Sequence, residues 1–81
     1  MTYETKGTCS RQIDIDINEL GVIEKVKFTG GCSGNTQGVA ALVVDMHIDD
    51  AIKRLDGIKC GPRSTSCPDQ LANALKNYKK Q

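Results

Sequence analysis

The sequence predicts an α+β fold, in which a short antiparallel sheet is followed by three helices packed on one face. Between residues 12 and 29 apolar residues alternate with polar ones, which is typical of half-buried strands. After residue 38 the apolar residues recur at the helical spacing of three and four. Strands that precede a run of helices indicate an α+β domain. A chain of 81 residues is long enough for a single domain, residues 1–81.

The sheet is predicted as a hairpin, which an edge strand within residues 2–8 can extend to three strands. The first strand of the hairpin, residues 12–17, reads QIDIDI, with isoleucines on one face and aspartates on the other. A turn at NELG leads to the second strand, VIEKVKFT, residues 22–29. Its apolar face is expected to carry Val22, Val26 and Phe28. Glu24 also falls on this face and Ile23 on the opposite one, so the alternation is less regular here.

Three helices are predicted after the glycine-rich turn TGGCSGNTQG. The first begins at a cap formed by Asn35 or Thr36. The second covers residues 48–55 and stops at Gly57. The third begins near Pro68, which suits the first turn of a helix. The expected apolar stripes are Val39, Leu42, Val43 and Met46; Ile48, Ala51, Ile52 and Leu55; and Leu71, Leu75 and Tyr78.

Composition and charge restrict the classes of partner and the cellular compartment that we expect for this protein. The net charge is only +1, whereas binding to phosphate backbones needs a basic excess, so no nucleic-acid partner is expected. The longest apolar run, VAALVV, is too short to span a membrane, and the first ten residues lack the apolar core of a secretory signal. We therefore expect a cytoplasmic protein. Because cytoplasmic thiols stay reduced, its four cysteines favour metal or redox chemistry over structural disulfides.

The four cysteines are the candidate metal ligands: Cys9, Cys32, Cys60 and Cys67. Each falls at the end of a predicted element, and such ends can converge at one edge of a two-layer fold. A helix N-terminus also favours the thiolate, which is the form that binds metal, and Cys67 has this position. The cysteines are separated by 22, 27 and 6 residues, so there is no C-x2-C pair. The spacing alone leaves open a shared metal site and separate reduced cysteines.

Two other patterns have simpler explanations. His47 lies between Asp45 and Asp49, but this D-x-H-x-D group falls where one predicted helix gives way to the next, so a capping or loop role is favoured over a metal site. The glycine-rich turn has no G-K-[ST] sequence and is therefore not a phosphate-binding P-loop. With a single histidine and no nucleotide-binding motif, the chain is not expected to be a complete enzyme.

Four segments resemble the TSCPD-domain family over nearly the whole chain: KGTCSRQI at 6–13, GGCSGNTQG at 30–38, RLDGIKCGPRSTSC at 54–67 and TSCPDQLA at 65–72. The resemblance implies a stand-alone form of a domain otherwise found at the C-terminus of ribonucleotide reductases. It also implies that the four cysteines are hallmark residues of a metal site. The order of Cys9, Cys32 and Cys67 is similar to that in iron–sulfur cluster assembly scaffolds, which bind zinc or a cluster, whereas Cys60 has no certain counterpart there.

Three functions are consistent with these residues. In the first, the four thiolates hold one zinc tetrahedrally, which would stabilise a small core and leave no open position for hydrolysis. In the second, the same ligands hold an iron–sulfur cluster. In the third, Cys60 and Cys67 form a redox dithiol that serves ribonucleoside-diphosphate reductase, with Cys67 as the attacking thiol. A protein partner, either the reductase or iron–sulfur machinery, is expected. The metal-site functions require all four sulfurs to meet in one pocket at the helix N-termini.

Overall fold

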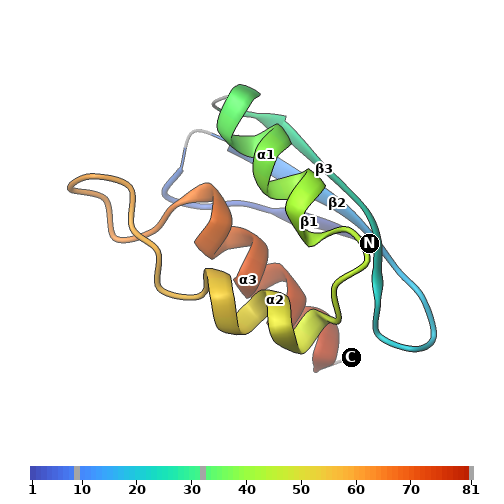
Figure 1. The fold of residues 1–81 in the computed structure, drawn as a ribbon. Coiled ribbons are helices and arrows are strands. Elements are labelled where there is room, and N and C mark those ends of the chain that lie inside the picture. Colours follow the sequence, from blue (N-terminus) through green and yellow to red (C-terminus); the bar gives the residue numbers. More distant parts are fainter. Residues whose placement is uncertain (9, 32, 81) are drawn as a thin grey trace.

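The computed structural model describes residues 1–8, 10–31 and 33–80, and within them the predicted α+β fold is confirmed (Figure 1). An antiparallel sheet has the strand order β1-β2-β3. Its strands are β1 (Thr2–Glu4), β2 (Ser10–Ile17) and β3 (Ile23–Gly30), and the helices are α1 (Ser33–Val43), α2 (Ile48–Leu55) and α3 (Cys67–Lys79). Helices α1 and α3 contact the sheet, while α2 lies alongside α3. None of these helices is long and apolar enough to cross a membrane.

The core lies between the sheet and the helices, as the alternation in β2 predicts. Ile13 and Ile15 are 0% and 1% exposed, whereas Asp16 between the flanking isoleucines is exposed. Burying one such side chain contributes about 1.5–3 kcal/mol. The buried apolar cluster comprises Ile13, Ile15, Ile23, Val26, Val43, Ile48, Ala51, Leu71, Ala74 and Leu75.

A β-bulge in β3 explains why the alternation predicted there is imperfect. The register pairs Asp16 with Lys25 but Ile17 with Ile23, so Glu24 is an extra residue. The extra residue turns Ile23 onto the core face, where it is completely buried, and leaves Glu24 exposed. The prediction of Ile23 on the polar face was therefore wrong. Val22 lies outside the strand and forms an isolated bridge with His47.

Helix α1 starts earlier and ends earlier than predicted. It begins at Ser33, before the expected caps, and ends at Val43, so Met46 lies in the connection to α2. Its buried residues are Thr36 and Val43, whereas Leu42 is 77% exposed. Successive residues on a helix are about 100° apart, which takes Leu42 off the face that Val43 presents to the core. The prediction of Leu42 as a core residue was wrong.

Helix α2 begins and ends where the sequence predicts, and α3 begins within one residue of Pro68, as predicted. The His47 side chain accepts a hydrogen bond from the Asp49 amide at the start of α2, and Gly57 follows its end with φ of 86°. At α3 the Ser66 hydroxyl accepts a hydrogen bond of 3.1 Å from the Asp69 amide. Pro68 stands in the first turn, where its missing N–H removes no helical hydrogen bond.

Candidate functional site

Cys67 is the first residue of α3, and its sulfur faces the beginning of β2. The side chain is only 5% exposed. Its Sγ lies 3.0 Å from Thr8 Oγ1 and 3.2 Å from Ser10 Oγ. The capped end of the helix thus presents a buried thiol to two hydroxyls that are more than fifty residues away in sequence.

Cys60 and Cys67 line the same pocket, which has a volume of about 340 Å³. Both are free thiols; Cys60 is exposed and Cys67 is buried. The pocket walls come from three separate parts of the chain: the segment before β2, the start of α1, and the loop that leads into α3. The lining residues are Thr8, Asn35, Ile58, Lys59, Cys60, Ser66, Cys67 and Pro68. Two of the four predicted ligands therefore line one pocket.

Cys9 and Cys32 lie outside the described residues, so the prediction that all four sulfurs converge remains a prediction. The described neighbours of both cysteines lie close together. Ser10, which follows Cys9 in the chain, pairs with Gly30 in the sheet. A Cβ added to Gly31 would come within 3.2 Å of the Ser10 side chain, so glycine permits a close approach here. Among residues 1–8, 10–31 and 33–80 there is no group of three metal-ligating side chains.

The loop that carries Cys60 is closed by residues at the start of α3. The buried Asp69 carboxylate accepts hydrogen bonds from the Gly57 amide, at 2.7 Å, and from the Thr65 hydroxyl, at 2.5 Å. The Ser66 hydroxyl donates to the carbonyl of Ile58 at 2.6 Å. Within the loop the Cys60 amide donates to the Thr65 carbonyl at 3.2 Å. These bonds hold the two ends of the loop together, and Cys60 and Cys67 both line the pocket beside it.

Gln70 connects the segment before β2 to the same helix start. Its side-chain oxygen accepts a hydrogen bond from the Lys6 amide, and its nitrogen donates to the Thr65 hydroxyl, both at 3.0 Å. The sequence alone indicates no role for Gln70 or for the hydroxyls of Thr8 and Ser10. A local signal does mark Asp69, because Ser66-x-x-Asp69 has the spacing of a capping box. No comparable local signal marks Gln70, whose partners are distant in the chain.

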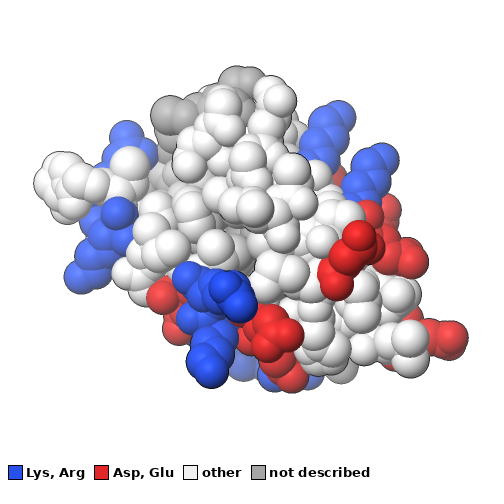
Figure 2. All heavy atoms as spheres, in the orientation of Figure 1, with Lys and Arg blue, Asp and Glu red and all other residues white. Residues whose placement is uncertain are grey.

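Basic side chains lie near the pocket. The loop between α2 and α3 extends away from the body of the molecule (Figure 1) and carries Lys59 and Arg63. Figure 2 shows basic side chains at this end, while basic and acidic side chains are mixed along the lower edge of the same face. Lys59 is one of the residues that line the pocket.

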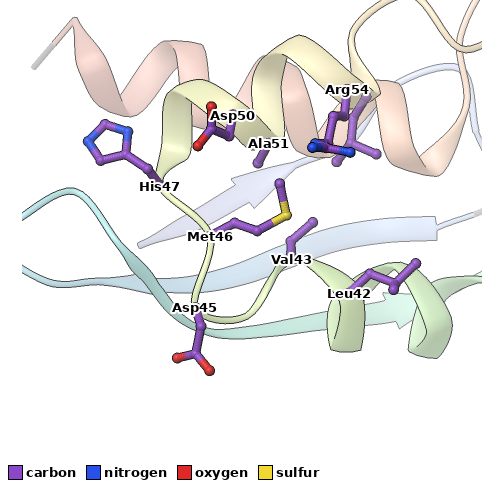
Figure 3. Close-up of a pocket in the computed structure, with 9 residues that line it drawn as sticks. Leu42, Val43, Asp45, Met46, His47, Asp50, Ala51 and Arg54 are labelled. Carbon is purple, nitrogen blue, oxygen red and sulfur yellow. The ribbon is translucent and has the colours of Figure 1, made fainter.

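His47 caps α2, as its place between two predicted helices favours. Its neighbour Asp49 also accepts a hydrogen bond from Lys79, and this bond holds the pKa of the Asp49 carboxyl below its ordinary value of 3.8. The Asp45 side chain points away from the His47 ring (Figure 3). Within the described part of the chain, the D-x-H-x-D pattern does not form a group suited to a metal.

A larger hollow, of about 530 Å³, lies between the end of α1 and helix α2 (Figure 3). Its lining is largely apolar and includes Leu42, Met46 and Leu55, with Asp50 and Arg54 from α2. None of its lining residues is a cysteine. Both cysteines that the structure describes therefore line the smaller pocket.

Comparison with known proteins identifies the family. The model of the TSCPD domain matches residues 1–79, which confirms the resemblance seen in the cysteine-bearing segments. No curated protein and no solved structure matches the chain. Because the match extends over nearly the whole sequence, the chain belongs to the TSCPD-domain family.

Proposed function

We propose that the protein is a cytoplasmic metal-binding module in which Cys9, Cys32, Cys60 and Cys67 hold one zinc ion. The observation that carries this proposal is that Cys60 and Cys67 line one pocket. Residues next to Cys9 in sequence support it: Thr8 and Ser10 flank Cys9, and both contact the Cys67 sulfur. The partner we propose is ribonucleotide reductase or iron–sulfur machinery, as the family resemblance implies.

The chemistry of the described donors fits this metal. Thiolate sulfur is a preferred ligand of zinc, and the Cys67 sulfur is already surrounded by groups that can donate hydrogen bonds to an anion. Bound zinc would supply a covalent-like cross-link between the strand end, the loop and the helix starts. Four thiolates leave no coordination position for a substrate water, so the proposed role is binding and not hydrolysis.

Metal analysis of the purified protein tests the proposal. Protein expressed with zinc is expected to contain one zinc per chain and to be colourless. Each single Cys→Ser variant is expected to lose most of this metal, because serine is a poor zinc ligand. Anaerobic expression with iron tests the iron–sulfur form, which would be brown. Wild-type protein that is metal-free under both conditions, with four reactive thiols, would contradict the proposal.

A redox role is a second candidate, favoured by the fact that two free thiols line one pocket. In this role a thiolate of the module attacks a disulfide of the reductase and releases one partner thiolate. The second cysteine then attacks the mixed disulfide, which releases the other partner thiolate and leaves a Cys60–Cys67 disulfide. Since Cys60 is exposed and Cys67 is buried, Cys60 is the better placed to reach the partner, in contrast to the expectation from sequence.

The redox role predicts a specific oxidised product of the wild type and a specific mixed disulfide that accumulates in a variant. Mixing reduced protein with the oxidised reductase should yield a module that has lost two hydrogens, with the bond mapped to Cys60 and Cys67. The Cys67→Ser variant should stop at a mixed disulfide through Cys60, because the resolving thiol is missing. Failure of the wild-type protein to exchange, or unchanged reductase support by Cys60→Ser, would exclude this role.

A further inference from the structure

We infer that the hydroxyls of Thr8 and Ser10 are hydrogen-bond donors to the metal-bound sulfur of Cys67 and that they set how tightly the site holds its metal. This inference rests on the proposed metal site. Both hydroxyl oxygens are within hydrogen-bonding distance of Sγ, at 3.0 and 3.2 Å. They come from the residues on either side of Cys9, so one short segment offers a proposed ligand and two donors to another ligand.

The two hydroxyls can serve both the thiol and the thiolate. In the thiol form the S–H of Cys67 donates to Ser10 Oγ. A metal-bound thiolate has no proton and can only accept, so the Ser10 hydroxyl must then rotate and donate its own proton to sulfur. A hydroxyl group is a donor and an acceptor, and it makes this exchange without movement of its oxygen. The same oxygen positions therefore suit the metal-free and metal-bound states.

Burial makes these donors important. Ser10 is 3% and Cys67 is 5% exposed, so water cannot replace a hydrogen bond that is lost between them. Thr8 is only half-buried, and water can partly replace its hydroxyl. Replacing residues that orient metal ligands and hydrogen-bond to them typically lowers metal affinity by about 10–100-fold. We therefore expect a larger loss for Ser10 than for Thr8.

The surrounding structure holds the donors in place before metal arrives. The Lys6 amide is bonded to Gln70 on α3, and the Thr5 hydroxyl donates to the Ser10 carbonyl. Ser10 is also paired with Gly30 in the sheet. The segment is thus anchored to the same helix that carries Cys67, which keeps the hydroxyl-to-sulfur distances short.

The test uses the full chain with Ser10→Ala and Thr8→Val, which remove the hydroxyls with little change in size. Zinc affinity is measured by competition with a chromophoric chelator, and the thiolate-to-cobalt charge-transfer band is recorded after loading with Co²⁺. We expect zinc binding to weaken about 10–100-fold for Ser10→Ala and less for Thr8→Val. We also expect the band to move to lower energy, because a sulfur that accepts fewer hydrogen bonds gives up electrons more easily.

Thr8→Ser, which keeps the hydroxyl, should restore the wild-type affinity and band. Thr29→Val, whose side chain does not line the pocket, is the matched control and should leave both readouts unchanged. The inference is overturned if Ser10→Ala and Thr8→Val bind zinc and show the cobalt band as the wild type does. A wild type that binds neither metal would overturn the proposed function itself, and this inference with it.

Discussion

Removing zinc from the purified protein is expected to lower its melting temperature by roughly 15–30 °C. A metal present at about a thousand times its dissociation constant stabilises the folded state by about 4 kcal/mol. In a domain of this size each kcal/mol shifts the melting temperature by about 4–8 °C. The effect is large because a small domain buries only a modest core and depends on cross-links between its elements. Thermal melts followed by circular dichroism, with and without a strong chelator and under reducing conditions, measure the shift.

Variants identify the source of this stabilisation. Cys60→Ser and Cys67→Ser should melt at the metal-free temperature whether or not chelator is present. His47→Asn is the matched control, since it removes the single histidine while asparagine still caps α2. This control should keep the full difference in melting temperature between protein with and without chelator. Coincident melts of the wild type with and without chelator would show that no structural metal is present.

Replacing Leu71 by alanine is expected to destabilise the protein by about 3 kcal/mol, within the usual range of about 2–5 kcal/mol for a buried leucine. Leu71 is 0% exposed and belongs to the cluster formed by α3, the sheet and the other helices. A domain of this length has a total stability of only about 4–12 kcal/mol. A loss of about 3 kcal/mol is a large fraction of this total, so the metal-free variant should unfold at a markedly lower urea concentration than the metal-free wild type. Urea unfolding of the loaded and chelated forms measures both effects.

Leu42→Ala makes the same chemical change at a position that the helical spacing also assigned to the core. Leu42 is 77% exposed, so its replacement should change the stability by less than about 0.5 kcal/mol. An equal decrease in the free energy of unfolding for the two variants would mean that Leu42 is buried in solution, or that α1 packs differently. Comparing Leu71→Ala with Leu42→Ala therefore tests which of two apolar helix positions is buried, a distinction that the helical spacing does not make.

Several features that depend on residues close together in the chain were predicted correctly, although the start of α1 was not. The alternation in QIDIDI identified β2 and its buried isoleucines, because the side chains of a strand point to opposite faces in turn. Apolar spacing identified the start of α2, and Pro68 identified that of α3 to within one residue, because both signals act over a single turn of helix. Cys67 at the start of α3 follows from the same local rule.

Features that depend on contacts between distant segments were missed or remained open. The bulge at Glu24 is visible only when β3 is paired with β2, since an extra residue is defined by its partner strand. The roles of Gln70, Thr8 and Ser10 depend on contacts across more than fifty residues.

The sequence was sufficient for the class of the fold, the places where α2 and α3 begin and the four thiols that could bind a metal, because each of these depends on short spacings and on residue chemistry. Folding in three dimensions selected which face of α1 is buried and brought Cys60 and Cys67 to one pocket. It did so because burial and side-chain hydrogen bonding depend on which distant segments meet, and no spacing along the chain specifies that.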